Sequence, residues 1–390
     1  MSSRSTAAVL ARRRRYFENQ SRIFEFDRVL GTGGHGDAYV FREVQSGTEK
    51  RKFVAKYSTS DARSIAQLQT EMRIAKKLHG AMHISQPIVD DGAMRTLRGI
   101  PASAPMEDRF VLFTEFLPGL TLERFIANTR QWDVVPNRVL WMIFLCLVKM
   151  CIAMAFPPDK PYGQTTEHPE SEVWPQVQVQ EKTEMKSDDD LATRLGGLAV
   201  ADGKDQNRQN KSTGSSPPDT ASVPVPEPTN SDGQIYHGDM DNFGNFVFGD
   251  FDPLDHWLVP ILKAIDFGLA IDSPGANLTG RIFPGVSPGT FTQANIYYMG
   301  RAMQNIYGHS PTADPTGSLP NLDMEIYELA GRCAHRDHTL RPPLAGLLAT
   351  VQNAVNTKTN PEHFPRKPYA MCETDDYIRT YLWSVLFSAS

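Results

Sequence analysis

The chain has 390 residues and a mass of 43.5 kDa, which exceeds a typical single domain and suits two lobes or two domains. With 40% hydrophobic and 22% charged residues and a mean hydropathy of −0.37, its composition is that of a soluble globular protein. Forty Lys and Arg against 45 Asp and Glu give a net charge of −5, which argues against a dedicated nucleic-acid-binding protein. The four cysteines form no C-x-x-C pair, a pattern that fits a reducing compartment.

The first 23 residues carry a basic cluster at positions 12–15. No apolar stretch follows this cluster, so it lacks the form of a secretory signal, and we expect a cytoplasmic or nuclear protein. The simplest interpretation of residues 1–23 is a solvated basic arm. A nuclear-import or anion-binding patch is the alternative.

The most apolar run covers residues 139–156 and is close to the length that crosses a bilayer. Lys149 interrupts this run, and Pro157 and Pro158 end it. We therefore predict a buried core helix and no membrane span.

Residues 159–233 differ in composition from the sequence on either side. They contain eight prolines, 14 acidic and 7 basic residues, which gives this segment a net charge of −7 and leaves about +2 for the rest of the chain. A segment so poor in aromatic residues cannot bury enough apolar surface to offset the entropy lost on ordering. We predict a disordered, acidic, Pro-rich insertion that either binds a partner or is phosphorylated, or is an expansion without a role of its own.

Residues 24–117 contain strand patterns on both sides of one helical pattern. The segments FEFDRVLGTGG, DAYVFREV, RKFVAKYS and RFVLFTEFL have the alternation of strands, whereas residues 64–79 place apolar side chains at helical spacing. Residues 118–158 and 234–390 are mainly helical in pattern. The predicted fold is therefore α+β and bilobal, with a small β-rich N-lobe at 24–117 and a mainly helical C-lobe.

A glycine-rich turn after the first predicted strand has the form G-x-G-x-x-G, with Gly31, Gly33 and Gly36. A dinucleotide-binding fold needs a helix straight after these glycines, but DAYVF predicts a strand. We interpret the turn as a hairpin whose backbone N–H groups can lie over phosphates. Lys56 on the next strand can hold the phosphates of ATP if Glu71, on the predicted helix, keeps its ammonium in place.

The segment TEFLPG at residues 114–119 ends a predicted strand between the two lobes. An exposed backbone at this point can offer C=O and N–H groups to the edge of an adenine, from Glu115 and Leu117. Taken alone, the segment also fits an ordinary linker between a strand and a helix.

The most specific segment is YHGDMDNFGN at residues 236–245, which is followed by a short apolar strand and then by LKAIDFG. Phosphoryl transfer needs a carboxylate that orients or deprotonates the acceptor hydroxyl, and oxygen ligands for Mg²⁺. Asp239 suits the first role, and Asn245 and Asp266 suit the second. For His237 we expect a supporting role in the structure.

These motifs stand in the order found in the protein kinase-like superfamily, which the chain resembles along nearly its whole length outside the insertion. Two later segments extend the resemblance: NIYYMG at 295–300 is similar to the family's D-x-W-x-x-G, and DHTLRP at 337–342 is similar to its D-P-x-x-R-P. The H-G-D loop, with GDFDP after it, also resembles divergent eukaryotic kinase-like proteins of the fungal type. The resemblance implies a kinase-like fold that uses ATP and Mg²⁺.

The catalytic loop departs from the family's pattern. Gly238 replaces the arginine that would pair with an activation-loop phosphate, so we expect no control by that switch. The loop from Asp239 to Asn245 is one residue longer than the family spacing, which makes Asn242 a fallback metal ligand. Asp241 stands where many serine/threonine kinases have a lysine.

The helical lobe departs as well. Residues 269–294 contain no clear A-P-E, so Arg341 lacks the glutamate that would be its usual partner. Asn295 stands where an aspartate normally braces the catalytic loop. The missing A-P-E puts the docking of a peptide substrate in doubt.

Three functions agree with these features. The leading one is ATP- and Mg²⁺-dependent phosphotransfer to serine or threonine hydroxyls of a protein substrate, in which Lys56 and Glu71 position the phosphates. A small-molecule hydroxyl kinase is the second, because the H-G-D loop and the missing A-P-E resemble aminoglycoside and choline kinase relatives. The third is a pseudokinase or scaffold that binds ATP without turnover, which the changed loop spacing, Asp241 and Asn295 suggest.

Overall fold

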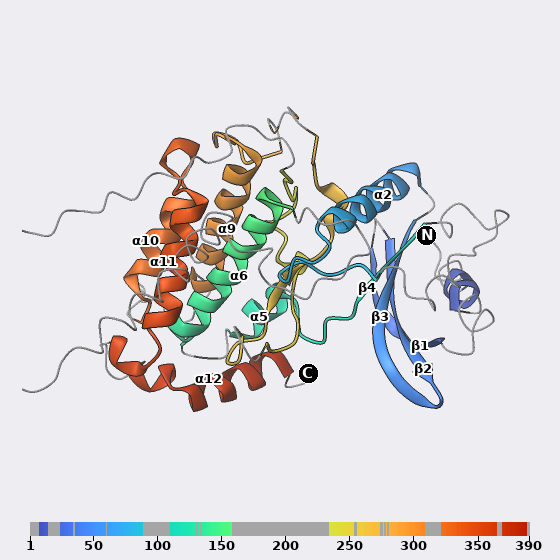
Figure 1. The fold of residues 1–390 in the computed structure, drawn as a ribbon, viewed down its shortest axis with the longest axis horizontal. Helices are drawn as coiled ribbons and strands as arrows, with labels where there is room; N and C mark the ends of the chain where they lie inside the picture. The colour runs from blue at the N-terminus through green and yellow to red at the C-terminus, as the bar shows by residue number, and fades with distance from the viewer. Residues whose placement is uncertain are drawn as a thin grey trace, which may run out of the picture. The chain divides into compact units, whose positions relative to one another are not determined.

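In a computed structural model of the chain, a four-stranded antiparallel sheet is followed by a mostly helical part (Figure 1). The predicted α+β class is thereby confirmed. The predicted insertion at 159–233 lies outside the residues that the structure describes, as does the tip of the glycine-rich turn. The described residues are 8–14, 24–33, 36–59, 61–88, 110–129, 132, 134–157, 234–252, 256–273, 276, 278, 281–308, 321–364 and 369–387.

The four predicted strands form one sheet with neighbours in chain order. Its strands are β1 (Phe24–Gly33), β2 (Gly36–Gln45), β3 (Thr48–Ser58) and β4 (Val111–Glu115). The glycine-rich turn joins β1 and β2 as a hairpin, with Gly33 opposite Gly36. The expectation of a strand rather than a helix after the glycines is confirmed, because β2 begins at Gly36.

One face of the sheet buries a cluster of aromatic side chains. Tyr39 and Phe41 of β2 lie two residues apart, as do Phe53 and Ala55 of β3, and residues at this spacing share a face of a strand. The ring of Phe53 stacks on Phe41 at 5.7 Å between centroids and meets the edge of Phe24 at 5.5 Å. This packing fixes the register of β3, the strand that carries Lys56.

The N-terminal segment packs on the sheet. Residues 8–14 are helical, and Arg13 is only 3% exposed. Its guanidinium donates to the carboxylate of Asp37 at 2.6 Å and lies 4.3 Å from the centre of the Tyr57 ring. The expectation of a solvated basic arm is therefore wrong at Arg13, because its charge is buried and paired.

The predicted helix of the sheet region is α2 (Ala62–Lys77), which contacts β3 and β4 (Figure 1). It begins at Asp61, whose carboxylate accepts a hydrogen bond from the Ser64 N–H at 2.9 Å and so satisfies one of the free donors of the first turn. Leu68 and Ile74 lie buried on its inner face. Apolar residues at helical spacing thus decide which side of α2 faces the protein.

The helical part is built around α6 (Asn137–Ala155), every residue of which is buried. It contacts α9 (Phe291–Gly308) and α11 (Leu344–Thr357) (Figure 1). Within the described part of the chain, α6 is the one helix long and apolar enough to cross a membrane by composition, but it lies wholly inside the protein. The predicted core helix is confirmed.

The remaining elements complete the helical part. A short hairpin of β5 (Phe246–Phe248) and β6 (Leu262–Ala264) lies in the segment that carries the predicted catalytic residues. The other α-helices are α5 (Leu122–Thr129), α10 (Met324–Cys333) and α12 (Asp375–Leu382), and α12 runs into a π turn, η8 (Trp383–Phe387). The short 3₁₀ turns are η3 (Phe243–Asn245), η4 (Phe267–Leu269), η5 (His338–Leu340), η6 (Pro361–His363) and η7 (Tyr369–Glu373).

Truncating Phe53 should destabilise the protein more than truncating an exposed aromatic residue does. We expect Phe53→Ala to lower the free energy of unfolding by roughly 3–5 kcal/mol, since it removes a fully buried ring and leaves a cavity. Phe251→Ala, which truncates a ring that is 46% exposed, should cost less than about 1 kcal/mol. Urea denaturation followed by circular dichroism measures both, and equal losses would contradict the assignment of Phe53 to the core.

Candidate functional site

Three predicted site residues meet around one ammonium group. The Nζ atom of Lys56, on β3, lies 2.6 Å from a carboxylate oxygen of Glu71 on α2. The same Nζ lies 2.8 Å from a carboxylate oxygen of Asp266, which directly precedes η4. The structure therefore brings together three residues that belong to separate elements of the chain.

The charges of Lys56 and Asp266 stabilise each other, whereas burial raises the pKa of Glu71 to about 7. Burial opposes the charge of Lys56, but the carboxylates of Glu71 and Asp266 together raise its pKa above the usual value. Burial also acts to raise the pKa of Asp266, but the ammonium of Lys56 outweighs it and lowers that pKa. Lys56 is therefore a firmly charged cation, and Asp266 is an ionised carboxylate at neutral pH.

Asp239 lies in the loop before β5 and is held by two asparagines. The side-chain amide of Asn245 donates to the Asp239 carboxylate at 3.0 Å and to its main-chain oxygen at 3.1 Å. The amide of Asn242 donates to the same carboxylate at 3.3 Å. Since the nitrogen of Asn245 is used in this way, its amide oxygen is the atom that could contact a cation.

Of the two asparagines, Asn245 is the one joined by a hydrogen bond to the residue before Asp266. Its main-chain oxygen accepts from the N–H of Ile265, the residue before Asp266, at 2.8 Å. The side-chain oxygen of Asn242 instead accepts from the N–H of Gly244 at 3.1 Å and caps η3. This arrangement favours Asn245 over the fallback Asn242 as a partner of Asp266.

Hydrogen bonds of His237 and Asn295 support the loop that contains Asp239. The side-chain oxygen of Asn295 accepts from the His237 N–H at 3.3 Å, and its amide nitrogen donates to the main-chain oxygen of Ile235 at 2.8 Å. The Nε2 atom of His237 lies 3.2 Å from the main-chain oxygen of Ile265. Burial lowers the pKa of His237, so its ring is neutral and donates to this oxygen. An amide at position 295 thus braces the loop where the family has a carboxylate.

Gly238 has a steric reason to be glycine. Its φ of +88° lies in the left-handed region, and a Cβ atom there would stand 2.2 Å from the main-chain oxygen of Leu269. An arginine at this position, as in the H-R-D loop, would need a different backbone. The departure from the family's pattern is therefore built into the way this loop packs against the segment after Asp266.

A cavity of about 350 Å³ adjoins these residues. Apolar side chains of the sheet form much of its wall, and Lys56 and Asp266 also line it. Its volume lies in the range of small-molecule sites. Further lining residues are Leu30, Ala38, Val54, Leu112, Thr114, Glu115 and Leu117.

Some of the groups predicted to contact adenine already bond other residues of the protein. The N–H of Glu115 donates to the main-chain oxygen of Gln86 at 2.9 Å, so this N–H does not face a ligand. The carboxylate of Glu115 pairs with Lys263 of β6 at 2.7 Å, a contact that sequence analysis did not anticipate. The main chain of Leu117 and the oxygen of Glu115 are the groups left to contact an adenine edge.

The three glycines of the turn have different surroundings. A Cβ atom at Gly36 would stand 2.1 Å from the main-chain oxygen of Tyr57, so glycine is required there by strand packing. A Cβ atom at Gly31 would meet nothing within 4 Å. Gly33 ends β1 directly before the tip of the turn. Close packing explains Gly36 without a ligand, whereas the open space at Gly31 leaves room for one.

Arg341 is held without the glutamate of the family's A-P-E motif. Its guanidinium donates to five main-chain oxygens, among them Ser287 at 2.6 Å and Gln293 at 2.7 Å. It also lies 5.1 Å from the centre of the Tyr297 ring. Burial lowers the pKa of Arg341 to about 10. Carbonyl groups thus take the place of the missing carboxylate and hold the segment before α9.

Asp272, which sequence analysis did not single out, joins α2 to the segment after η4. Its buried carboxylate pairs with Arg73 and Lys77, both on α2. These cations lower the pKa of Asp272 although burial acts to raise it. The contact holds α2, and with it Glu71, next to the segment that follows Asp266.

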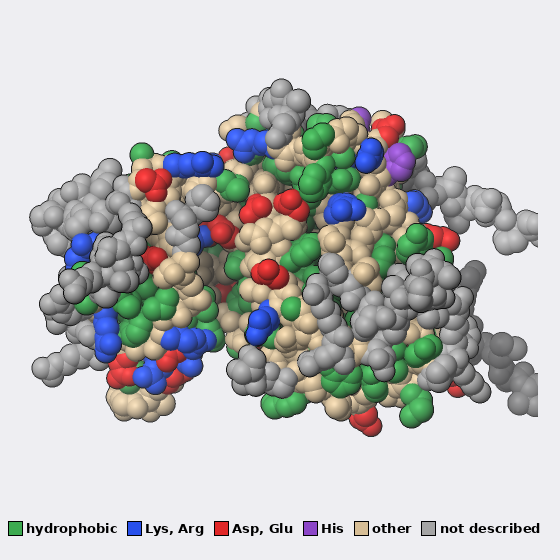
Figure 2. Space-filling model, turned by 180° about the vertical axis from the view of Figure 1, so that it is seen from behind, with side chains coloured by type: hydrophobic (Ala, Val, Ile, Leu, Met, Phe, Trp, Pro, Cys, Tyr) green, Lys and Arg blue, Asp and Glu red, His purple; other side chains and the backbone are tan. Residues whose placement is uncertain are grey.

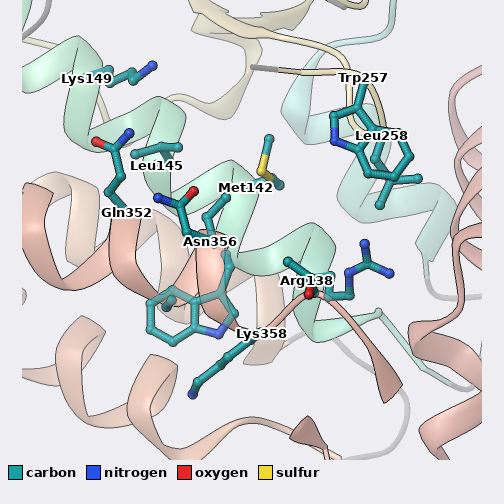
Figure 3. A pocket seen from close by; sticks show the side chains of 13 residues that line it. Arg138, Met142, Leu145, Lys149, Trp257, Leu258, Gln352, Asn356 and Lys358 are labelled. Carbon is teal, nitrogen blue, oxygen red and sulfur yellow. The ribbon is translucent and has the colours of Figure 1, made fainter. Parts of the chain in front are cut away.

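A second cavity, of about 400 Å³, lies in the helical part. Figure 3 shows α6 side chains such as Arg138 and Lys149 on one side and Gln352 and Asn356 of α11 on another. It contains none of the predicted site residues and no carboxylate. We therefore place the candidate site at the cavity beside Lys56.

On the face shown in Figure 2, the Lys and Arg side chains of the described residues lie scattered among Asp and Glu. A scan against models of protein families finds no match for this chain, and a search among curated proteins finds none either. The geometry of the site is therefore the basis for a functional proposal.

Adding a side chain at Gly238 should distort the loop that contains Asp239. We expect Gly238→Ala to lower the free energy of unfolding by about 3 kcal/mol or more, because a left-handed φ and a backbone clash both oppose the methyl group. Gly285→Ala is the matched control: its φ is +77°, but the added Cβ would meet nothing within 4 Å, so about 1–2 kcal/mol is expected. Thermal unfolding compares the variants, and equal losses would show that the contact with Leu269 is unimportant.

Proposed function

We propose that this chain is a phosphotransferase with a bilobal protein kinase-like fold, which transfers the γ-phosphoryl group of ATP to serine or threonine hydroxyls of a protein. The observation that carries the proposal is the meeting of Lys56, Glu71 and Asp266 around one ion-pair network beside a cavity. Structural ion pairs also occur in unrelated proteins, but here Asn245 is hydrogen-bonded both to Asp239 and to Ile265, the residue before Asp266.

ATP would enter the cavity with its adenine between the apolar side chains of the sheet. The main-chain oxygen of Glu115 and the main chain of Leu117 would meet the adenine edge, and Lys56 would contact the phosphates. Glu71, only 6% exposed, keeps the ammonium of Lys56 fixed. A fixed cation stabilises the phosphates more effectively than a mobile one, because no reorganisation is needed on binding.

The donor set suits Mg²⁺. Asp266 offers a carboxylate, and Asn245 offers the oxygen of an amide whose nitrogen already binds Asp239. Hard oxygen ligands of this kind, together with phosphate oxygens, are what Mg²⁺ prefers. When bound, the cation would neutralise charge on the phosphates, and Asp266 and Asn245 would hold it.

Asp239 would act on the acceptor. Its carboxylate is held by Asn242 and Asn245 and would accept a hydrogen bond from the acceptor hydroxyl. The hydroxyl oxygen forms a bond to the γ-phosphorus while the bond from that phosphorus to the β–γ bridging oxygen breaks. The hydroxyl proton passes to Asp239, and ADP leaves with the electron pair of the broken bond.

The anchoring of Arg341 supports a protein as acceptor. In the kinase family the segment before α9 carries the A-P-E motif and takes part in peptide docking. Here the carbonyls of Ser287, Pro288 and Gln293 bind Arg341 and give this segment a fixed path without that motif. A fixed segment is a surface on which a peptide could dock.

Phosphotransfer should depend on the acidic residues of the site. We expect wild-type protein to transfer labelled γ-phosphate from ATP, with Mg²⁺, to itself or to a generic protein acceptor. Asp239→Asn should lower this rate by at least about 100-fold while ATP binding persists, because it removes the group that takes the proton. Asp266→Ala should lower both transfer and Mg²⁺-dependent ATP binding.

Asp250→Asn is the control, because Asp250 is an exposed acidic residue of the adjoining loop and lines no part of the site cavity. Its rate should equal that of the wild type. Binding of ATP without transfer to any acceptor would favour the pseudokinase. Transfer to small hydroxylated compounds but not to proteins would favour the small-molecule kinase, and absence of ATP binding would refute the proposal as a whole.

A further inference from the structure

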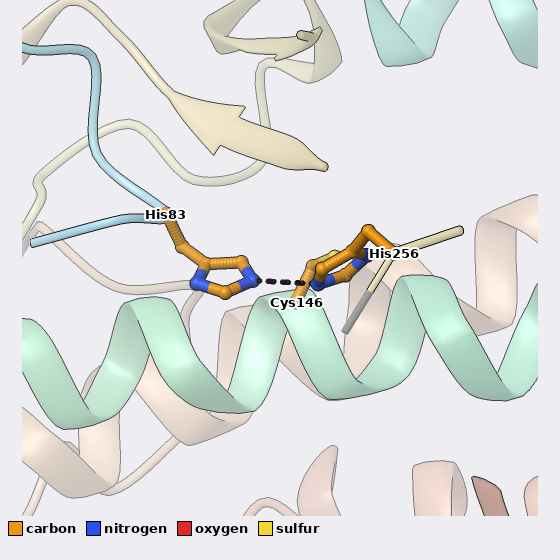
Figure 4. A group of neighbouring side chains, drawn as sticks. All are labelled: His83, Cys146 and His256. Atoms are coloured by element: carbon orange, nitrogen blue, oxygen red, sulfur yellow. Dashed lines mark hydrogen bonds between the residues drawn. The ribbon is translucent and has the colours of Figure 1, made fainter. Parts of the chain in front are cut away.

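Two histidines and a cysteine meet in the interior, outside the candidate phosphotransfer site (Figure 4). His83 follows α2, Cys146 lies in the middle of α6, and His256 lies in the connection between β5 and β6. All three side chains are fully buried. One potential ligand atom from each lies within 4.8 Å of the others.

The distances are close to those of a tetrahedral metal site. Zinc–nitrogen bonds of about 2.0–2.1 Å place two ligand nitrogens about 3.3 Å apart at tetrahedral angles. The Nε2 atoms of His83 and His256 are 3.3 Å apart and point toward each other (Figure 4). At tetrahedral angles a zinc-bound sulfur lies about 3.6 Å from each nitrogen, so the sulfur of Cys146 would have to approach the nitrogens by up to about 1.2 Å.

The chemistry of the group also suits a transition metal. Both histidine side chains are fully buried beside Cys146. A neutral imidazole is the form that binds metal. Imidazole and thiolate ligands favour Zn²⁺ over Mg²⁺ or Ca²⁺, which prefer oxygen.

We propose that His83, Cys146 and His256 bind one Zn²⁺ ion, with a fourth position left for water or another donor. Cys146 would bind as a thiolate and release its proton to solvent on binding. This site is independent of the proposed phosphotransfer, since it shares none of its residues. Without a metal, the same atoms would form only a hydrogen bond between the two imidazoles.

A metal bound here would connect three segments of the chain near β6, the strand that ends two residues before Asp266. The main-chain oxygen of His83 accepts from the N–H of Ala264 at 2.9 Å, and Ala264 is two residues before Asp266. The next residue, Ile84, bridges to Ala264. Zinc would therefore join α6 and the β5–β6 connection to the segment that supports β6.

Metal binding to the full-length purified protein tests the proposal directly. After treatment with a chelator, the protein is titrated with Co²⁺, which reports thiolate ligation by a sulfur-to-cobalt charge-transfer absorption and tetrahedral geometry by its visible bands. We expect both signals at one ion per chain and their loss on addition of Zn²⁺. Zn²⁺ should also raise the unfolding temperature of the chelator-treated protein by several degrees.

Variants assign the signals to the three residues. Cys146→Ser should abolish the charge-transfer absorption, and His83→Gln or His256→Gln should weaken Zn²⁺ binding by more than about 100-fold, beyond the effect of losing a group that only orients a ligand. Cys151→Ser is the matched control: Cys151 is a buried cysteine of the same helix, and its substitution should leave the cobalt spectrum unchanged.

Wild-type protein alone can overturn the proposal, even if a variant fails to fold. No charge-transfer absorption with Co²⁺, or no effect of Zn²⁺ on the unfolding temperature, would mean that the two imidazoles form a hydrogen-bonded pair only. A spectrum that is lost in Cys151→Ser and kept in Cys146→Ser would place the metal elsewhere.

Discussion

The ammonium of Lys56, held between two carboxylates, is the interaction on which the arrangement of the site depends. Glu71 is on a helix and Asp266 lies two residues after a short hairpin of the helical part, so a single partly buried cation draws together elements far apart in the chain. Removal of either carboxylate would leave this cation less well compensated. The aromatic packing under β3 and the ion pairs of Asp272 with α2 keep Lys56 and Glu71 in place.

The departures from the kinase pattern have local physical explanations. At Gly238 the backbone adopts a left-handed conformation too close to Leu269 for any side chain. At Asn295 an amide makes two hydrogen bonds to the main chain before Asp239, one as acceptor and one as donor, which a carboxylate could not do. Around Arg341, main-chain oxygens replace a carboxylate. Each departure is therefore matched by its surroundings, as expected of a sequence whose local and long-range preferences agree.

The two inferred sites share the hairpin of β5 and β6. Its second strand leads to Asp266, while its connection contains His256. The hairpin is short, so its position depends on contacts with α6 and with the segment after α2 rather than on its own hydrogen bonds. Contacts that hold this hairpin in place therefore affect the position of Asp266.

The sequence by itself determined the four strands, α2 and α6, because the spacing of apolar residues is a local property of the chain. It also singled out Lys56, Glu71, Asp239 and Asp266, because each stands in a short motif and these motifs follow one another in the kinase-like order. Only the tertiary structure decided that Arg13 is buried against Asp37, that Lys263 forms an ion pair with Glu115, and that His83 and Cys146 meet His256. No local pattern in the sequence predicts these contacts. Each of them joins segments that are distant in the chain, and their packing depends on the whole folded protein.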